Sequence, residues 1–181
     1  MLDPHQIGFR KLTMADLPLI HRWLNETPTV KDFYGHGEET PYAAVVAKYE
    51  PRVKGEDPTT SYIITYGETP IGYIQTYLWR SYPDYAQYLE LQEEAASLDV
   101  FIGDEEYLHK GLGSHMLRAF VDQIIFADPR IASCVITPEA RNPSALRAYE
   151  KAGFQRVREI DHPDEPGPVC LMRIGREALP A

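Results

Sequence analysis

A strand, a glycine turn and a helix follow one another within residues 98–117, and this succession constrains the fold more than any other feature. Leu98–Ile102 is apolar except for Asp99, which is typical of a buried strand. After a polar stretch comes the run His109-Lys110-Gly111-Leu112-Gly113-Ser114, and an amphipathic helical pattern begins directly after it. A glycine turn that opens a helix directs bare backbone N–H groups and the positive end of the helix toward one point, which suits a phosphate.

The glycine turn taken alone is a weak motif, because many ordinary turns contain Gly-x-Gly. The third glycine of the dinucleotide-binding fingerprint is absent, and so is the Gly-Lys-Ser/Thr of a Walker A loop. A plain structural turn therefore stays open as an alternative at this point.

Hydrophobic periodicity predicts strands and helices in the order βααβββαβαββ. The connection through the glycine turn implies locally parallel strands, and the hairpins imply antiparallel pairing elsewhere, so a mixed sheet is expected. The expected strands are Ile7–Leu12, Ser61–Tyr66, Ile71–Trp79, Asp99–Ile102, Ala132–Thr137, Phe154–Ile160 and Val169–Ile174.

Local signals mark where the four helices begin and end. Thr13 with Asp16 three residues later resembles a capping box and starts the first helix. Pro41 predicts the start of the second helix, which Pro51 is expected to close after a loop over Val30–Thr40. The third helix begins at the glycine turn. The fourth follows Asn142-Pro143 and ends at Gly153.

Composition excludes several classes of protein. The formal net charge of −9 argues against nucleic acid as a partner and permits a cationic ligand. No apolar run approaches the ~20 residues that span a membrane, and no secretory signal is visible, so a cytoplasmic protein is expected. The two cysteines and six histidines show no disulfide framework and no metal-ligand spacing. The 181 residues are expected to form one domain, residues 1–181.

A second motif gives the glycine turn a context. Asn142-Pro143-Ser144 opens a helix that continues as Tyr149-Glu150-Lys151-Ala152-Gly153-Phe154, about 30 residues beyond the turn. Together the two motifs resemble the GCN5-related N-acetyltransferase (GNAT) superfamily, whose pyrophosphate loop reads Q/R-x-x-G-x-G/A. The chain departs from that loop at His109, which weakens one phosphate contact and leaves the backbone turn intact.

The resemblance implies a fold and a co-substrate. The fold is α/β (α+β), with a mixed, mostly antiparallel central sheet, a V-shaped split between strands and about four flanking helices. Acetyl-CoA is the implied co-substrate, with no metal. The residues expected to bind it are Val100, Phe101, Ile102, His109, Lys110, Gly111, Leu112, Gly113, Ser114, Asn142 and Ser144.

Within the superfamily, the chain is most similar to the aminoglycoside 6′-N-acetyltransferases. The similarity is carried by Leu24-Asn25, residues 70–77, Asp99 with Phe101, residues 110–113 and residues 149–154. Siderophore-type lysine acyltransferases share the glycine turn and the closing helix, but they typically have a His where this chain has Asp99. The expected reaction is therefore acetylation of the 6′-amine of an aminoglycoside. Acylation of a siderophore or another small amine, and an acyl-CoA-binding module without turnover, are the alternatives.

Asp99 and Tyr149 are the expected catalytic residues. A carboxylate in an apolar strand is costly to bury without a partner, and it can accept the proton that an ammonium must lose before attack. Tyr149 lies seven positions after Asn142, on the same helix face, and the resemblance assigns it protonation of the CoA thiolate. A salt-bridged aspartate and a core tyrosine are the structural alternatives. Asn142 reads first as a helix cap.

Acidic and aromatic side chains suit a polycationic acceptor. The chain departs from the resembled family at Ala86-Gln87, where paired tryptophans are expected, and at Thr137, where an acid is expected. A solvated flap is the alternative for the Tyr- and Glu-rich stretch. The expected partner is a small-molecule amine, bound by a monomer or homodimer. The residues expected to bind it are Phe33, Tyr34, Glu38, Tyr49, Asp84, Tyr85, Asp99 and Glu139.

Overall fold

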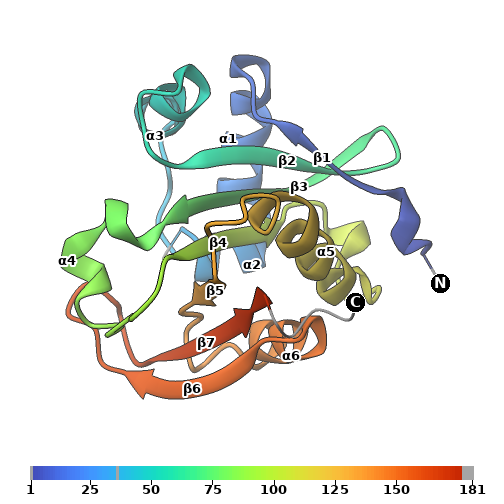
Figure 1. Cartoon of the computed structure of the whole chain (residues 1–181). Coiled ribbons are helices and arrows are strands. Elements are labelled where there is room, and N and C mark those ends of the chain that lie inside the picture. Colours follow the sequence, from blue (N-terminus) through green and yellow to red (C-terminus); the bar gives the residue numbers. More distant parts are fainter. Residues whose placement is uncertain (1, 36, 177–181) are drawn as a thin grey trace. The chain divides into compact units, whose positions relative to one another are not determined.

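The computed structural model describes residues 2–35 and 37–176. It comprises two compact units, one of Met1–Thr76 with Asp99–Lys110 and the other of Tyr77–Leu98 with Gly111–Ala181. The seven strands follow the order β1-β2-β3-β4-β5-β7-β6 (Figure 1). The division between the units passes through β3 (Thr69–Leu78) and β4 (Ala95–Ile102).

The first unit is built on antiparallel strands. β1 (Ile7–Lys11) pairs with β2 (Thr60–Tyr66), and β2 pairs with β3. In this register Ser61 lies directly opposite Gln75. Because side chains alternate along a strand, Tyr73 and Gln75 point to the same face of β3.

Three helices belong to the first unit: α1 (Leu17–Glu26), α2 (Pro28–Phe33) and α3 (Tyr42–Lys54). α1 buries a stripe at helical spacing, and α3 contributes Val45 and Tyr49 to the same core. The stripe of α1 consists of Leu17, Ile20, Trp23 and Leu24.

The carboxyl end of β4 is fixed by α1 and its C-cap. Gly103 follows the strand, and a Cβ there would lie 2.2 Å from the ring of Trp23, so no other residue fits. The hydroxyl of Thr27 donates to the carbonyl of Gly103 at 2.6 Å. The segment that carries Asp99 is therefore held by close packing and by a buried hydrogen bond.

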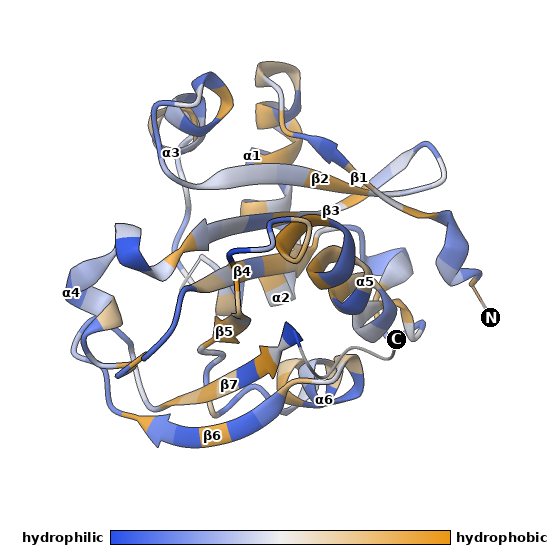
Figure 2. Ribbon diagram, in the orientation of Figure 1, coloured by the Kyte–Doolittle hydropathy of each residue, from blue (hydrophilic) through white to orange (hydrophobic). Residues whose placement is uncertain are grey.

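The second unit contains the parallel pair. The start of β4 pairs with β5 (Ser133–Ile136) at Ala95 and Ala96. β5 then pairs antiparallel with β7 (Val169–Gly175), which pairs antiparallel with β6 (Gln155–Ile160). β7 is almost wholly buried, whereas β6 is exposed and mostly hydrophilic (Figure 2).

The helices of the second unit are α4 (Pro83–Ala86), α5 (Leu112–Phe120) and α6 (Pro143–Ala152). α5 packs against α6 and continues into a π-helical turn at Val121–Ile125. Asn142 caps α6 by accepting the N–H of Ala145 at 3.0 Å, and Gly153 follows the helix with a φ of 104°. Both ends of this helix were predicted from local signals, and both predictions are confirmed.

The predicted order of strands and longer helices is confirmed, with three local corrections. Val30–Thr40 is not all loop, because Pro28 at the first helical position starts α2. Pro51 does not end α3, since a proline near the end of a helix removes only one hydrogen bond, and Gly55 ends it instead. β4 begins at Ala95, four residues earlier than predicted, because alanines are poor indicators of a strand.

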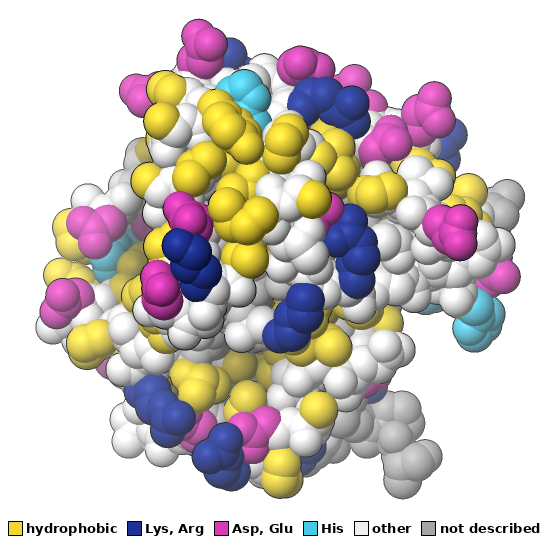
Figure 3. All heavy atoms as spheres, turned by 90° about the horizontal axis from the view of Figure 1, so that it is seen from above, with side chains coloured by type: hydrophobic (Ala, Val, Ile, Leu, Met, Phe, Trp, Pro, Cys, Tyr) yellow, Lys and Arg dark blue, Asp and Glu magenta, His cyan; other side chains and the backbone are white. Residues whose placement is uncertain are grey.

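No helix within the described residues is long and apolar enough to cross a membrane. Lys and Arg side chains are scattered among Asp and Glu on the face shown in Figure 3. Cys134 and Cys170 are buried, and their sulfur atoms are not joined in a disulfide. The prediction of a single domain over residues 1–181 stays a prediction.

The predicted capping box is present and includes Arg10. The Asp16 carboxylate accepts from the N–H of Thr13 at 2.9 Å and from its hydroxyl at 2.8 Å. Arg10 donates to the two carboxylate oxygens at 2.8 and 2.7 Å. Burial acts to raise the pKa of Asp16, but the hydrogen bonds from Arg10 and Thr13 outweigh it and lower the pKa.

We expect Asp16→Ala to lower the free energy of unfolding by about 2 kcal/mol at neutral pH. A depressed folded-state pKa gives stability that is present above the unfolded value of about 3.9 and is lost as pH falls through the folded value. Urea unfolding near pH 6 should therefore show a larger difference between variant and wild type than unfolding near about pH 3.

Glu50→Ala is the control for this prediction. Glu50 pairs with Lys54 on the surface of α3 at 2.7 Å, and its loss should cost about 0.5 kcal/mol or less. An equal cost of Asp16→Ala at both pH values would contradict the electrostatic account.

Candidate active site

Asp99 lies on β4 and is partly exposed. The side-chain amide of Gln75 on β3 donates through Nε2 to Asp99 Oδ2 at 2.6 Å. The carboxylate is thus held by an amide donor from the neighbouring part of the same unit. A hydrogen bond of this length to a carboxylate is charge-assisted and favours the ionised form.

Gln75 is itself held by two donors. Its Oε1 accepts from Arg52 Nη1 at 2.6 Å and from the hydroxyl of Tyr73 at 2.6 Å. The Tyr73 hydroxyl also lies 2.7 Å from Oγ of Ser61. Gln75 is only 5% exposed and Tyr73 is fully buried, so water does not compete strongly for these bonds.

Aromatic rings line the same part of the first unit. Tyr73 stacks on Phe101 with centroids 5.4 Å apart, and Tyr49 meets Tyr73 edge to face at 5.3 Å. Tyr34, which follows α2, packs against Phe101 at 4.8 Å. The side chain of Phe101 thus belongs to the core, which leaves only its backbone for the predicted binding of a co-substrate.

The tyrosines of this group keep their protons. Burial raises the pKa of Tyr49 to about 12 and raises the pKa values of Tyr34 and Tyr73 further above the ordinary value. The charge of Asp99 acts in the same direction on Tyr34 and Tyr49. All three hydroxyls are therefore hydrogen-bond donors at neutral pH.

A lysine from α3 already lies over two of these rings. Lys48 Nζ is 5.2 Å from the centroid of Tyr34 and 5.5 Å from that of Tyr49, within the range of cation–π attraction. Desolvation and then repulsion by Arg52 lower the pKa of Lys48, while the charge of Asp99 acts to raise it. The unit that carries the Asp99 carboxylate therefore also contains two nearby cations, Lys48 and Arg52.

The remaining predicted acceptor residues of the first unit are peripheral. Phe33 is the last residue of α2 and is partly buried. Glu38 is exposed in the segment after α2, and its N–H donates to the carbonyl of Gly35 at 3.1 Å. The structure thus gathers Tyr34, Tyr49 and Asp99 around Tyr73.

The glycine turn opens α5, the predicted third helix. Gly111 is its N-cap with a φ of 83°, and a Cβ at Gly111 would meet nothing within 4 Å. His109 also has a positive φ, 57°, and both His109 and Lys110 are exposed. The side chain of Leu112 is buried, so only its backbone is available to a ligand. Gly113 and Ser114 form the first turn of α5 and are partly exposed.

This geometry fits a phosphate. The helix has nine residues, and its first N–H groups have no carbonyl partner within the helix itself. A Cβ at the N-cap Gly111 would meet no atom within 4 Å. These N–H groups and the helix dipole both favour an anion.

α6 carries the other predicted residues. Tyr149 is 8% exposed and packs edge to face on Phe154 with centroids 5.4 Å apart. Ser144 is exposed in the first turn, and Asn142 is occupied as the helix cap. Tyr149 is therefore anchored at its ring by a core contact.

Tyr85 on α4 has structural partners. Its ring stacks on Trp79 at 5.3 Å and on His162 at 3.8 Å, and its hydroxyl donates to Glu165 at 2.9 Å. The hydroxyl also lies 3.1 Å from that of Thr137. These contacts fasten α4 to the β6–β7 connection.

The two predicted acids of the second unit differ in their surroundings. Asp84 is exposed in the first turn of α4. Glu139, named as the substitute for the missing acid at position 137, pairs with Arg141 at 2.5 Å. Asp84 thus presents an exposed carboxylate, whereas Glu139 is partly neutralised.

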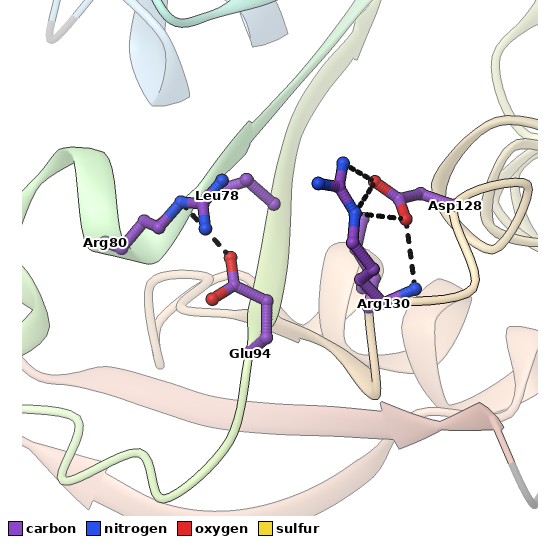
Figure 4. A pocket seen from close by; sticks show the side chains of 6 residues that line it. Leu78, Arg80, Glu94, Asp128 and Arg130 are labelled. Carbon is purple, nitrogen blue, oxygen red and sulfur yellow. Dashed lines mark hydrogen bonds and ion pairs between the residues drawn. The ribbon is translucent and has the colours of Figure 1, made fainter.

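A pocket in the second unit, lined by Leu78, Arg80, Glu94, Asp128, Arg130 and Ile131, contains no predicted site residue (Figure 4). Its charges pair internally, Arg80 with Glu94 at 3.4 Å and Arg130 with Asp128 at 2.6 Å. Over the described residues, no group of three His, Cys, Asp or Glu side chains is placed to hold a metal ion.

Sequence reasoning missed Gln75, Arg52 and Lys48. Gln75 lies within residues 70–77, which carried the family resemblance, but no role followed from the residue type alone. Arg52 falls after Pro51, where the helix was expected to have ended, although it lies on α3. The spacing of Lys48 and Arg52, four residues apart, was the available signal that both face one side of a helix.

Comparison with known proteins identifies relatives of the whole chain. Residues 13–162 match the family model of the acetyltransferase (GNAT) domain. The aminoglycoside N(6′)-acetyltransferase type 1 of Klebsiella pneumoniae is 32% identical over 173 residues, which are 96% of this chain and 85% of the relative.

Solved structures of similar proteins contain the implied ligands. A structure of AAC(6′)-Ib in complex with acetyl-CoA is 32% identical and covers 96% of this chain and 95% of that chain, with a TM-score of 0.85. Another, of this aminoglycoside acetyltransferase with coenzyme A and kanamycin, is 31% identical and covers 95% and 96%, with a TM-score of 0.84. The fold expected from the two sequence motifs is thereby confirmed.

Proposed function

This chain belongs to the GNAT acetyltransferase family, and on that premise we propose that it transfers the acetyl group of acetyl-CoA to the 6′-amine of aminoglycosides. The observation that carries the proposal is the Asp99 carboxylate, held at one oxygen by Gln75 and accompanied by tyrosine rings in the same unit. A carboxylate beside aromatic faces is suited to an amine that arrives as a cation.

Asp99 performs the first proton transfer. The acceptor arrives mostly as an ammonium, and Asp99 accepts a proton from it directly or through one water. The amine nitrogen then forms a C–N bond to the acetyl carbon of the thioester. The carboxylate also attracts the cation before the transfer.

The glycine turn and α6 bind acetyl-CoA and act on its thioester. Backbone N–H groups of Gly111, Gly113 and their neighbours hold the pyrophosphate, with charge added by His109 and Lys110. The backbone of Val100–Ile102 holds the pantetheine arm and polarises the thioester carbonyl. As the C–S bond breaks, Tyr149 donates its proton to the sulfur, and the second proton that the nitrogen loses on becoming an amide restores the phenol through water. The proton held by Asp99 passes to solvent, so the products are the acetylated amine, the CoA thiol and one proton. Asn142 and Ser144 contact the same arm.

Acceptor selection is assigned to the residues predicted to bind the amine. Phe33, Tyr34, Glu38 and Tyr49 act with Asp99, and Asp84 is the exposed acid on α4. Tyr85, which stacks on His162, and Glu139, which pairs with Arg141, complete the proposed set of acceptor residues. The cytoplasmic location and the state of monomer or homodimer stay predictions.

An acceptor panel tests the proposed function. Wild type and Asp99→Ala are mixed with acetyl-CoA or longer acyl-CoAs and with kanamycin-type aminoglycosides, polyamines, lysine or hydroxylysine, and free CoA is measured. We expect the highest kcat/KM for acetyl-CoA with an aminoglycoside that has a 6′-amine, and a loss of about 10²- to 10⁴-fold in Asp99→Ala. Preference for a siderophore-type amine, or binding of CoA without its release for any amine, would overturn the proposal.

For Tyr149→Phe we expect kcat to fall by about 10- to 10³-fold with little change in KM for the acceptor, because the acid that protonates the leaving sulfur is lost. Tyr62→Phe is the matched control, since Tyr62 is also 8% exposed and its hydroxyl accepts from Lys11 at 3.0 Å. Unchanged kcat in Tyr149→Phe would remove the residue from the mechanism.

Gly111→Ala tests the phosphate turn against Gly55→Ala. Both glycines have a similar positive φ, 83° and 74°, and neither Cβ would meet an atom within 4 Å. Each substitution should therefore cost a similar ~1–2 kcal/mol of stability. We expect only Gly111→Ala to raise KM for acetyl-CoA, by about tenfold or more, because it disturbs the N–H groups at the helix start. Equal KM values in the two variants would contradict the assignment.

A further inference from the structure

The side chain of Gln75 has one orientation that its neighbours permit. An amide can be turned over without a change of shape, so the positions of its oxygen and nitrogen follow from the hydrogen bonds around it. The guanidinium of Arg52 only donates, and it lies 2.6 Å from the end of Gln75 that also receives the Tyr73 hydroxyl. That end must be the oxygen, and the NH₂ group must face Asp99.

The hydroxyls beyond Gln75 follow the same direction. Tyr73 uses its one proton toward Gln75, so across the 2.7 Å contact Ser61 is the donor and Tyr73 the acceptor. Each donor in the series Ser61, Tyr73, Gln75 therefore points toward Asp99. Hydrogen bonds aligned in this way polarise one another, which strengthens the last bond of the series.

The amide also separates two opposite charges. Arg52 is cationic at one end of Gln75, and Asp99 is anionic at the other end. A direct pair between arginine and carboxylate would use both carboxylate oxygens and neutralise them. Through the amide, Arg52 polarises the N–H group that donates to Oδ2 of Asp99.

We propose that Gln75, oriented by Arg52 and Tyr73, is the positioning residue of the Asp99 base: the hydrogen bond from its amide to Oδ2 sets the orientation of the carboxylate that receives the acceptor amine. The proposal rests on the proposed function for the role of the amine, but the arrangement of Gln75 and Asp99 is independent of the acceptor. Gln75 acts through Asp99 and performs no proton transfer itself. The hydrogen bond that Gln75 donates to the carboxylate also favours its ionised form.

Other charged and titratable groups face this carboxylate. Lys48 and Tyr49 of α3 and Tyr34 beyond α2 lie within its field, and Arg52 and Tyr73 act through Gln75. The three tyrosines stay neutral. Lys48 is a cation whose charge interacts with that of Asp99, and the cation Arg52 also pairs with Asp57 at 3.8 Å. A change at Gln75 leaves both cations in place, which isolates the effect of the amide.

Gln75→Glu is the decisive substitution, because it keeps the shape and the acceptor for Arg52 while it replaces the N–H donor by an oxygen. Two carboxylates then lie side by side, and one of them must hold a proton. We expect kcat/KM for the aminoglycoside to fall by about 10- to 100-fold at pH 7. The acid limb of its pH profile should move up by about one unit or more, with KM for acetyl-CoA unchanged.

A second measurement does not need turnover. The carboxyl ¹³C resonance of Asp99, assigned by its loss in Asp99→Asn, is followed with pH in wild type, Gln75→Glu and Tyr73→Phe. We expect its midpoint to rise in Gln75→Glu and to rise less in Tyr73→Phe, which removes one of the two donors to Gln75. Gln155→Glu, an exposed position on β6, is the matched control and should shift neither curve.

The outcomes separate the two proposals. A wild type that acetylates no amine, together with a raised Asp99 midpoint in Gln75→Glu, would overturn the proposed function and support the positioning. If wild type acetylates aminoglycosides, but Gln75→Glu moves neither the acid limb of the kcat/KM profile nor the midpoint of the Asp99 titration, the positioning role of Gln75 alone is overturned. Because Tyr73→Phe keeps Gln75 and Arg52, it gives the same comparison if Gln75→Glu does not fold.

Discussion

The packing of Trp23 against Gly103 is the constraint on which the position of Asp99 depends. The ring occupies the space where a Cβ at Gly103 would be, and the Thr27 hydroxyl holds the adjacent carbonyl. With its end fixed in this way, β4 places Phe101 in the core and Asp99 two residues earlier on the same face. The core contact of one residue thus determines where the carboxylate of the other lies.

Polar side chains on β2 and β3 orient the Asp99 carboxylate through hydrogen bonds. Ser61, Tyr73 and Gln75 lie on neighbouring strands, in a register that places Ser61 opposite Gln75. Arg52 on α3 donates a hydrogen bond to Gln75. Ser61, Tyr73 and Gln75 are buried, so a missing partner there would cost more than the loss of a typical exposed hydrogen bond. The network is therefore both part of the core of the unit and the support of its reactive group.

Sequence patterns predicted what depends on near neighbours in the chain. The caps at Asp16 and Asn142 and the glycine turn at Gly111 are local, because residues within four positions form them. Gln75 and Arg52 were not predicted, since a glutamine in a strand and an arginine in a helix have no meaning until tertiary structure brings them within 2.6 Å. The stacking of Tyr85 on Trp79 and His162 likewise depends on tertiary structure, and its predicted part in binding the acceptor stays a prediction.

Net charge is a poor guide to the field at the acceptor side. The chain has a formal charge of −9, which favours cationic ligands at long range. Yet the charge of Lys48 acts on Asp99, and Arg52 donates to the Gln75 amide that holds this carboxylate. Lys48 already interacts with the rings of Tyr34 and Tyr49, so an arriving ammonium meets aromatic faces that are shared with a resident cation. In the proposed function, the contribution of Asp99 to attraction at short range depends on its carboxylate staying ionised and correctly oriented. The hydrogen bond from Gln75 supplies both conditions without adding a further charge.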